Sequence, residues 1–445
     1  LRSACDELMH RGPDDAGIWQ NLSSNVGLAH RRLAILDLSP LGHQPMVSSD
    51  ASVVLVFNGE IYNFSELRDE LIAKDVVFKG HSDTEVLLNL YMTEGQAMLS
   101  RLNGIFAFSI WDERTKELFV ARDALGVKPL YYSHENSKFV FASEIKALQS
   151  LSEVATDLDE DSIQQYLSFL WCPGEGTPFR AIRKLGPGEA LIVKAGQIEK
   201  QWKWYELPVC SSKSASRMSA SSAIEGSASY LRAAVHRQLI ADVPIGAFLS
   251  GGLDSSAVVA FARELKPDIH CFTIDTGGKK EEGSIDDLPY ARHMAKYLGV
   301  SLDVVHVDAQ RMAGDLETMV YQLDEPLADP SPLNVLYISQ LAREHGIKVL
   351  LSGAGGDDLF TGYRRHRAVM AERWWSWLPL SARRLLERTP SLTDQRNTLG
   401  RRLSKAFSGA TLEGDERLVN YFRWISREDL RQLYSEEFKA AVYDT

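Results

Sequence analysis

The sequence predicts two fold classes in succession: an α+β sandwich of antiparallel sheets, then an α/β domain with a parallel sheet and a helical C-terminal part. Short apolar segments separated by polar turns fill about the first 150 residues. From about residue 224, apolar segments alternate with helical patterns, which is typical of a parallel sheet with helices on both faces. After about residue 367 the pattern is helical. A chain of 445 residues is long enough for two or three domains.

The first half is predicted to contain many short strands and few helices. Strands in hairpin-like succession indicate antiparallel sheets that helices cover. The predicted strands are Val26–His30, Leu33–Leu36, Val53–Phe57, Gly104–Trp111, Leu118–Arg122 and Lys138–Ala142, the helices are Glu66–Lys74 and Thr84–Glu94, and a closing hairpin runs from Leu185 to Tyr205.

The second half begins after Ser211 to Ser222, a stretch rich in Ser and Ala that is typical of a linker. We therefore expect one domain over 1–208, a linker over 209–223 and a second domain over 224–445. In the second domain the predicted strands are Val243–Leu249, His270–Ile274, Leu302–Val307 and Lys348–Ser352, and the helices between them are Ser229–Gln238, Ser255–Leu265, Leu288–Leu298 and Leu333–His345.

Composition and charge exclude several classes of protein. The net charge of −11 leaves no excess of Lys and Arg to neutralise phosphates, so we expect no nucleic-acid binding. The four cysteines, Cys5, Cys172, Cys210 and Cys271, lie far apart without metal-ligand spacing, which favours reduced structural thiols in a cytoplasmic protein. Apolar runs stay shorter than a membrane span and no signal peptide is recognised, so no membrane association is expected.

A glycine-rich turn, Ser250-Gly251-Gly252-Leu253-Asp254-Ser255, lies between a predicted strand and a predicted helix. Glycines let the backbone approach an anion, and the free N–H groups of a helix start point toward it. The stretch is not a Walker loop, because an acid stands where that motif has a lysine. Asp254 beside bound phosphates is favourable if Mg²⁺ bridges them. The alternative is a glycine-rich turn without a ligand.

A second turn of the same kind follows the predicted strand from Lys348. Ser352-Gly353-Ala354-Gly355-Gly356-Asp357-Asp358 again joins a strand end, glycines and acids. Ligands of parallel sheets bind beyond the carboxyl ends of the strands, so we expect Asp254 and Asp357 to face each other and share Mg²⁺. The alternative is a flexible turn with solvated acids. Asp324-Glu325-Pro326 adds more acids, for which a solvated loop is an equal alternative.

Several polar stretches in the first half are not explained by packing. An arginine together with Glu60 and Asp83 suits an α-amino acid, because the guanidinium binds the α-carboxylate and the acids bind the ammonium. The Asn58 side-chain amide and the Gly59 N–H can supply two donors to a developing oxyanion. The alternative is a type I′ hairpin turn at Asn58-Gly59 and surface ion pairs.

These stretches together resemble the glutaminase domain of class II amidotransferases, an N-terminal-nucleophile hydrolase. The two Ser-Gly turns resemble the pyrophosphatase loop of enzymes that adenylate a substrate. The combination resembles the glutamine-hydrolysing asparagine synthetase family over nearly the whole chain. The matching stretches are Arg11-Gly12-Pro13-Asp14, Arg32-Leu33, Phe57-Asn58-Gly59-Glu60-Ile61-Tyr62-Asn63, Ser82-Asp83, Leu102-Asn103-Gly104-Ile105-Phe106-Ala107, Arg122-Asp123 and both Ser-Gly loops.

The resemblance implies a role for each matching residue. It implies glutamine binding by Arg32, Glu60 and Asp83, and an oxyanion hole from Asn58 and Gly59. It implies ATP and Mg²⁺ as cofactors, the metal being held by Asp254 and Asp357. The remaining nucleotide contacts that it implies are Leu249 and Ile274 at the adenosine, Ser250, Gly251, Gly252 and Ser255 at the pyrophosphate, and Ser352 and Gly353 at the nucleotide.

The implied activity is an ATP-dependent, glutamine-hydrolysing amide ligase. A thiol attacks the glutamine side-chain amide, and ammonia passes to a second site where ATP has adenylated a carboxylate. Ammonia then displaces AMP and leaves an amide. With aspartate as the acceptor, the product is asparagine. The implied partners are these small molecules and a second copy of the chain in a homodimer.

Three departures from the family pattern leave alternatives open. The family's nucleophile is a cysteine at the mature N-terminus. Leu1 is not a cysteine, and Cys5 lies elsewhere. We therefore expect a truncated start, and ammonia rather than glutamine as the nitrogen source. Ala354 replaces an acid of asparagine-forming members, so another carboxylate, such as a uronic-acid sugar, is the alternative acceptor. A basic acceptor-side segment is missing before Thr445, so we also expect a truncated end. An inactive relative with a binding role is the third alternative, which intact Asp254 argues against.

Overall fold

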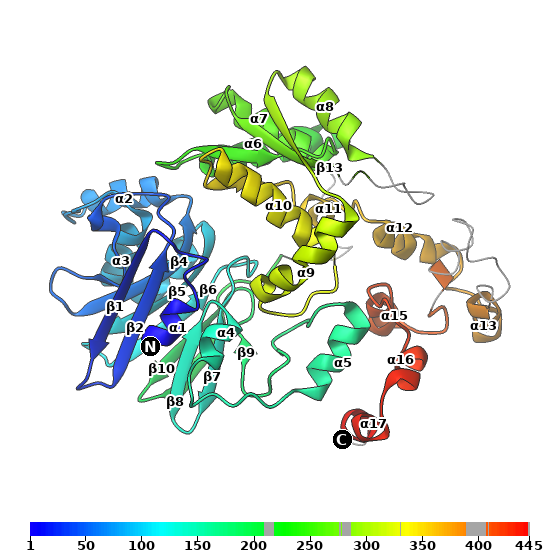
Figure 1. Ribbon diagram of the computed structural model, residues 1–445, viewed down its shortest axis with the longest axis horizontal. Helices are drawn as coiled ribbons and strands as arrows, with labels where there is room; N and C mark the ends of the chain where they lie inside the picture. The colour runs from blue at the N-terminus through cyan, green and yellow to red at the C-terminus, as the bar shows by residue number, and fades with distance from the viewer. Residues whose placement is uncertain are drawn as a thin grey trace. The chain divides into compact units, whose positions relative to one another are not determined.

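The computed structural model describes residues 1–208, 218–275, 277, 286–329, 331–388, 406–407 and 409–443. The chain divides into two compact units, which Figure 1 shows with the element labels used below. The antiparallel unit contains Leu1–Ile163, Cys172–Pro244 and Val320–Pro326, and the parallel unit contains Gln164–Trp171, Ile245–Met319 and Leu327–Thr445. Residues 224–244 and 320–326, from the second half of the sequence, thus belong to the antiparallel unit.

A six-stranded antiparallel sheet is the centre of the antiparallel unit. Its strand order is β11-β10-β6-β5-β4-β3. Along β4, Val53, Leu55 and Phe57 join one apolar cluster while Val54 and Val56 join another, as the two-residue repeat of a strand requires. The strands are β3 (Met46–Val47), β4 (Val53–Ile61), β5 (Gly104–Asp112), β6 (Glu117–Arg122), β10 (Glu189–Lys194) and β11 (Gln197–Lys203).

Helices cover one face of this sheet and further strands cover the other. Helices α2 (Phe64–Ile72) and α3 (Asp83–Glu94) bury their apolar side chains on the first face. Leu28 and Tyr132 pack on the second face, from the small sheets β1-β2 and β8-β7-β9. The predicted sandwich of antiparallel sheets is confirmed. The added strands are β1 (Asp15–Asn21), β2 (Val26–Arg32), β7 (Tyr131–Glu135), β8 (Lys138–Ala142) and β9 (Arg183–Lys184).

The predicted strand Leu33–Leu36 is wrong, because this stretch has no regular structure. Its backbone groups are bonded by side chains instead of by a neighbouring strand. The Arg32 guanidinium donates to the Leu36 carbonyl at 2.9 Å, and the Ala34 N–H donates to the Asp14 carboxylate at 2.9 Å. The chain here is therefore held in a shape that positions Arg32.

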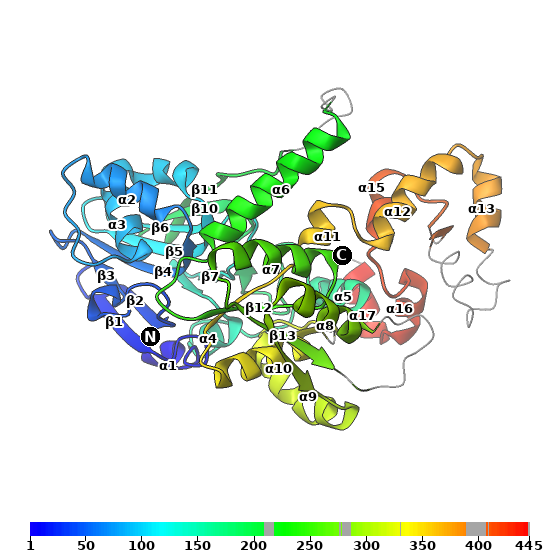
Figure 2. The same ribbon diagram turned by 90° about the horizontal axis from the view of Figure 1, so that it is seen from above.

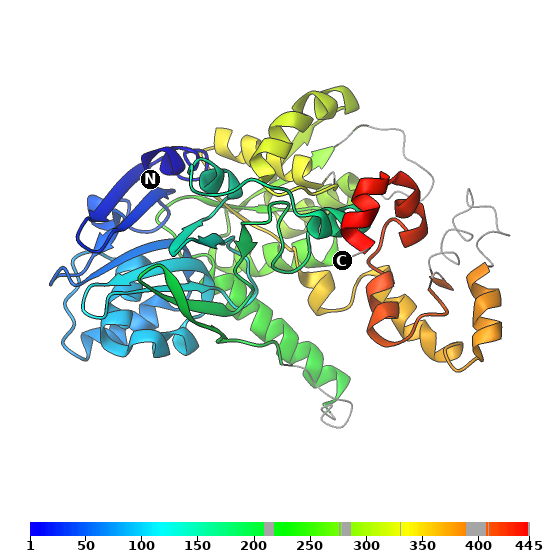
Figure 3. The same ribbon diagram turned by 90° about the horizontal axis from the view of Figure 1, so that it is seen from below.

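Helix α6 (Ala220–Arg237) begins inside the predicted linker and runs unbroken (Figures 2 and 3). The Ser219 hydroxyl accepts from the Ser222 N–H at 3.1 Å and caps the helix start. Residues 220–223 are thus helix rather than linker, because serines suit a helix N-terminus as well as a loop. Residues 209–217, which include Cys210, lie outside the described residues. The other three cysteines are buried free thiols.

A four-stranded parallel sheet forms the centre of the parallel unit, as predicted. Its strand order is β14-β13-β12-β15, and every pairing is parallel. Figure 1 shows α7 and α8 on one side of this sheet and α10 on the other, where Ile338 and Ala342 pack on Phe272. The elements are β12 (Ile245–Phe248), α7 (Leu253–Leu265), β13 (His270–Asp275), α8 (Asp287–Leu298), β14 (Ser301–His306), α10 (Ser331–Glu344) and β15 (Val349–Leu351).

After β15, all the regular secondary structure of the described residues is helical, which confirms the predicted helical C-terminal part. Among the described residues, no helix combines the length and the apolar character needed to cross a membrane. The remaining helices are α1 (Arg2–Asp6), η1 (Pro40–Gly42), η2 (Gly95–Arg101), α4 (Ile145–Gln149), α5 (Glu160–Phe169), α9 (Ala309–Leu323), α11 (Gly356–Leu359), α12 (Arg364–Ala371), η3 (Glu372–Trp374), α13 (Leu380–Arg388), α15 (Gly414–Asn420), α16 (Arg427–Leu433) and α17 (Glu436–Tyr443).

Candidate active site

A cavity of about 520 Å³ opens in the antiparallel unit. The size is that of a small-molecule site. Strands β2 and β4 and the first turn of α3 supply much of its polar lining. The structure brings together here all the residues predicted for the glutamine side, namely Arg32, Asn58, Gly59, Glu60 and Asp83.

Asn58 and Gly59 lie within strand β4, where they pair with Ala107 and Phe106 of β5. The alternative of a hairpin turn at this dipeptide is therefore wrong. A Cβ atom at Gly59 would come 2.2 Å from the Ile105 carbonyl oxygen, so only glycine fits. The Asn58 side-chain amide donates to the Ser143 hydroxyl at 3.4 Å. Both residues thus present donors at the cavity wall from a rigid strand.

Arg32 is held by backbone carbonyls. Its guanidinium donates to Leu36 at 2.9 Å and to Asp37 at 2.7 Å, and the side chain is only 8% exposed. A Cβ atom at Gly42 would lie 2.0 Å from the guanidinium, so the glycine makes room for it. Within the described residues, no carboxylate lies at ion-pair distance from Arg32. Its charge is therefore available to an anionic group in the cavity.

Glu60 and Asp83 form a pair of acids at the same cavity. Asp83 accepts a hydrogen bond from the Ile61 N–H at 3.0 Å. Burial raises the pKa of both carboxyl groups, and the nearby Asp83 raises the pKa of Glu60 further, while the Lys128 ammonium opposes this rise. A second cation bound between the two acids would favour their charged forms. The pair therefore suits a ligand ammonium group.

Sequence reasoning missed two other cavity residues. Lys128 follows β6, and burial lowers its pKa. The His30 imidazole contacts the Phe57 carbonyl at 3.0 Å, and burial lowers its pKa to about 4, so the ring is neutral at physiological pH. His30 precedes Arg32 by two residues on β2, a spacing that places both on one face; Lys128 gives no comparable signal. Cys5, which the sequence analysis placed elsewhere, lines the same cavity, with its thiol 3.7 Å from the His30 carbonyl.

The first Ser-Gly turn leaves β12 and enters α7. The hydroxyls of Ser250 and Ser255 lie 3.0 Å apart, and the Gly252 N–H donates to Ser250 at 3.3 Å. Gly251 has a φ of +81°, and a Cβ atom there would lie 2.4 Å from the Ala291 nitrogen. Helix α7 starts at Leu253, two residues earlier than predicted. Asp254 therefore lies in its first turn.

The second Ser-Gly turn leaves β15, which neighbours β12, and contacts the first turn. A Cβ atom at Gly353 would lie 2.7 Å from the Ser255 nitrogen, and one at Gly356 would lie 2.4 Å from the Asp254 carboxylate. Asp357 follows directly. Burial raises the pKa of Tyr363, and the nearby charges of Asp358, Asp357 and Asp254 raise it further. Both acids thus lie at the same end of the sheet.

The two turns fit a magnesium nucleotide chemically. Gly252 has no side chain to cap α7, so the first N–H groups of this helix are available to a phosphate. Carboxylate oxygens such as those of Asp254 and Asp357 are the ligands that Mg²⁺ prefers. Leu249 is buried just after β12, where its N–H donates to the Phe272 carbonyl of β13 at 2.9 Å, and Ile274 lies two residues further along β13. The structure therefore gathers the predicted nucleotide contacts around the carboxyl ends of neighbouring strands.

Asp324 is not part of this arrangement. Its carboxylate accepts from the Ile145 and Lys146 N–H groups, the latter at 2.9 Å, at the start of α4 in the antiparallel unit. Its side chain is nearly buried, so the alternative of a solvated loop is wrong for this residue. The Glu325 carboxylate likewise contacts the Lys184 ammonium at 2.7 Å. Both acids serve the packing of the antiparallel unit.

Comparison with known proteins decides the family. The family model "Glutamine amidotransferase domain" matches residues 1–205, and the family model "Asparagine synthase" matches residues 227–441. A Methanocaldococcus jannaschii relative, whose name is that of a second glutamine-hydrolyzing asparagine synthetase, is 34% identical over 384 residues, or 81% of this chain and 71% of the relative. The chain belongs to the glutamine-hydrolysing asparagine synthetase family.

Other relatives of this asparagine synthetase family member carry two kinds of name. Asparagine synthetase [glutamine-hydrolyzing] 1 of Bacillus subtilis is 35% identical over 382 residues, 85% of this chain and 58% of the relative. A Gibberella zeae relative named as an amidase is 32% identical over 395 residues, 85% of this chain and 57% of the relative. The chain thus spans less than two thirds of the length of these two relatives.

Proposed function

We propose that the chain is an ATP-dependent amide ligase that makes asparagine from aspartate and ammonia, and that its glutamine side supplies this ammonia when the thiol of the family's N-terminal cysteine is present. The observation that carries this proposal is the contact of the two Ser-Gly turns, in which Gly356 makes room for the Asp254 carboxylate. An anion-binding helix start and two acids then lie at one end of the parallel sheet, where such sheets bind ligands. Family membership supports the same chemistry.

On the glutamine side, we assign the α-carboxylate to Arg32 and the α-ammonium to Glu60 and Asp83. The guanidinium is charged and fixed by two carbonyls, and the acids have raised pKa values that a bound cation would lower. Asn58 and Gly59 would stabilise the oxyanion formed when a thiol attacks the side-chain amide. Water then releases glutamate from the thioester, and ammonia is set free.

On the nucleotide side, Leu249 and Ile274 would contact the adenosine, and Ser352 and Gly353 the nucleotide. Asp254 and Asp357 would hold Mg²⁺, which when bound cancels the repulsion between these carboxylates and the phosphates. The chain's own contribution is to fix the phosphates against rigid backbone N–H groups, so that little reorganisation is needed during the reaction. The residues that would hold the pyrophosphate are Ser250, Gly251, Gly252 and Ser255.

The proposed reaction proceeds in two balanced steps. A carboxylate oxygen of aspartate attacks the α-phosphorus of ATP and displaces pyrophosphate. Ammonia then attacks the activated carbonyl carbon, loses a proton to solvent, and displaces AMP. With glutamine hydrolysis included, aspartate, glutamine, ATP and water give asparagine, glutamate, AMP and pyrophosphate. We place this reaction in the cytoplasm and in a homodimer.

A second candidate keeps the chemistry and changes the acceptor. Ala354 lies exposed in the second Ser-Gly turn, where its N–H donates to the Ser352 hydroxyl at 3.1 Å and its methyl group can neither accept a proton nor position ammonia. Two relatives, from Gibberella zeae and Penicillium rubens, are named as amidases. Another carboxylate, such as that of a uronic-acid sugar, is the acceptor in this case.

Pyrophosphate release tests both candidates. The full chain is incubated with ATP, Mg²⁺ and ammonia, with aspartate or a uronic acid as the acceptor. Release that depends on aspartate supports asparagine formation, and release that depends on the uronic acid supports the second candidate. A variant with Asp254→Asn controls for contaminating pyrophosphatases and ATPases. No release with any carboxylate would leave a binding role for an inactive protein and contradict both.

A further inference from the structure

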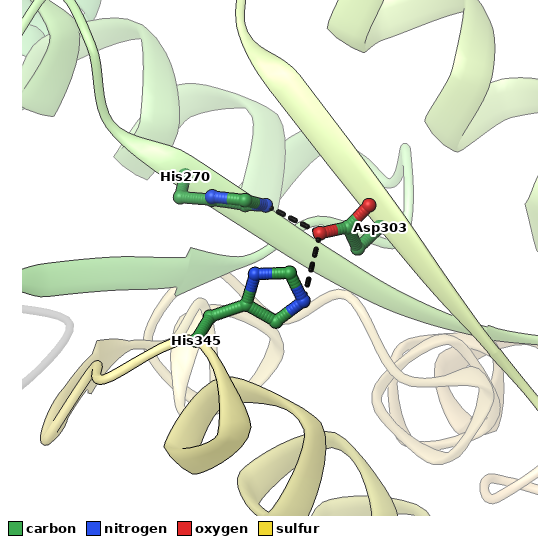
Figure 4. A group of neighbouring side chains, drawn as sticks. All are labelled: His270, Asp303 and His345. Atoms are coloured by element: carbon green, nitrogen blue, oxygen red, sulfur yellow. Dashed lines mark hydrogen bonds and ion pairs between the residues drawn. The ribbon is translucent and has the colours of Figure 1, made fainter.

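Two histidines and an aspartate converge on one point of the parallel unit (Figure 4). His270 is the first residue of β13, Asp303 lies on β14, and His345 follows the end of α10. The Nε2 atoms of His270 and His345 lie 2.7 Å and 3.2 Å from the same Asp303 oxygen, Oδ2. One ligating atom from each of the three residues lies within 4.8 Å of the others.

Buried aromatic packing holds these rings in place. The Phe272 ring stacks on the His270 ring with centroids 4.7 Å apart and an interplanar angle of 7°. The same phenyl ring meets the His345 ring edge-on at 5.7 Å. Phe272 is fully buried in the core between the sheet and α10. Because this side chain is fixed, both imidazoles are oriented before any ligand binds.

The distances suit a small divalent cation. Two ligands bound tetrahedrally to Zn²⁺ at about 2.0–2.2 Å lie roughly 3.3 Å from each other. The observed separations of 2.7 Å and 3.2 Å therefore need to widen by less than about 1 Å. His345 is 39% exposed and Asp303 is 41% exposed, so a metal could enter and a water could complete the coordination.

We propose that His270, Asp303 and His345 form a site for a transition-metal cation, with Zn²⁺ as the preferred metal. Two imidazoles and one carboxylate are the ligand set of open zinc sites. Mg²⁺ prefers oxygen ligands alone, so this site is chemically different from the acids at the Ser-Gly turns. The proposed metal site does not depend on the proposed ligase function.

The site lies away from the Ser-Gly turns. In the parallel sheet, His270 begins β13, while Ser250 and Ser352 follow the carboxyl ends of β12 and β15. A metal here would join β13, β14 and the connection from α10 to β15. Its role is to stabilise the sheet from the end opposite the nucleotide, and no ligand of the cation takes part in the reaction.

Metal titration of the full chain tests the proposal. After treatment with a chelator, Zn²⁺ binding is followed by calorimetry in excess Mg²⁺, and Co²⁺ binding by its visible absorption. We expect one Zn²⁺ site whose affinity falls by more than about tenfold in the variants His345→Ala and Asp303→Asn. Zn²⁺ should raise the melting temperature of the unaltered chain and not of these variants.

His306→Ala provides a matched control. His306 Nδ1 lies 3.1 Å from an Asp275 oxygen on the same two strands, but among the described residues no third metal ligand joins this pair. The control should keep both the zinc affinity and the cobalt spectrum. Unchanged binding in His345→Ala and Asp303→Asn, or a chain that binds no Zn²⁺ at micromolar concentration, would overturn the proposal. Circular dichroism verifies that each variant is folded, and His345 is exposed enough for its loss to be tolerated.

Discussion

The two proposed sites, one in each unit, are built in opposite ways. In the antiparallel unit, Arg32 and Asp83 are buried and already bonded to backbone groups around a formed cavity. In the parallel unit, Ala354 is exposed on the second Ser-Gly turn and Asp357 is exposed in the short helix α11 that follows. In a preformed site, the residues that bind the ligand also stabilise the fold. In an exposed site, the binding residues become ordered only when the ligand binds. Substitutions should therefore affect stability in the first unit and catalysis alone in the second.

The largest expected effect is on catalysis at the exposed site. Asp254→Asn keeps the shape of the side chain and removes the charge that would hold Mg²⁺. We expect acceptor-dependent pyrophosphate release to fall by roughly two orders of magnitude or more, because a charged group beside the reacting phosphates is lost. The free energy of unfolding should change by less than about 0.5 kcal/mol. A large loss of stability would contradict the claim that substitutions in the parallel unit affect catalysis alone.

The next effect is on the buried charges of the antiparallel unit. The Lys146 ammonium is 12% exposed and lies 2.7 Å from Glu144 and 3.4 Å from Asp324, both nearly buried. Lys146→Met removes the ammonium group that pairs with these carboxylates. The free energy of unfolding, measured by chemical denaturation, should fall by about 3 kcal/mol. The control Lys194→Met removes a 43% exposed ammonium from its 3.4 Å contact with Glu117 and should cost less than about 1 kcal/mol. Equal costs would contradict the role given to the buried cluster.

Glycine substitutions sharpen the comparison. Gly59→Ala forces a methyl group against the Ile105 carbonyl within paired strands and should destabilise the chain by about 1–3 kcal/mol. Gly356→Ala meets the end of the Asp254 side chain, which can move, so it should raise the KM for ATP with little change in stability. Gly226→Ala, in α6 with nothing near its Cβ position, should stabilise by about 0.4–1 kcal/mol. Thermal and denaturant unfolding of the three variants would show whether this order holds.

A further expected effect is a pH dependence of glutamine binding. The raised pKa values of Glu60 and Asp83 mean that the empty site loses stability as the pH rises through them, since the acids must then be charged in a buried place. A bound ammonium lowers both pKa values, so binding releases protons and strengthens with rising pH, by up to about tenfold per pH unit for each proton. Glu60→Gln should flatten this rise in a calorimetric titration. An affinity that falls with pH would contradict the assignment.

The sequence predicted the central strands well and the segments bonded by side chains poorly. Val53–Phe57 was expected from an unbroken apolar run, and β4 extends it through Asn58 and Gly59. The stretch Leu33–Leu36 is as apolar but forms no strand, because Arg32 and Asp14 bond its backbone. β1 was missed because its side chains are mostly polar or small. The apolar pattern of a stretch does not show such side-chain bonds to its backbone.

The same limit applies to the site. The five residues of the glutamine side could be named from sequence motifs, because the residue types alone indicate their chemistry. Lys128 and the packing role of Asp324 could not, because they depend on which distant segments meet in the fold. The sequence likewise does not distinguish Gly356 from the neighbouring glycines, because its role depends on the adjacent Asp254 carboxylate.

The central claim is that the two Ser-Gly turns hold a magnesium nucleotide so that AMP is transferred to a carboxylate. Exchange of labelled pyrophosphate into ATP measures this transfer directly and needs no ammonia. We predict exchange that requires an acceptor carboxylate and Mg²⁺ and that disappears with Asp254→Asn. Formation of ADP and phosphate in place of exchange, or exchange unaffected by Asp254→Asn, would contradict the account.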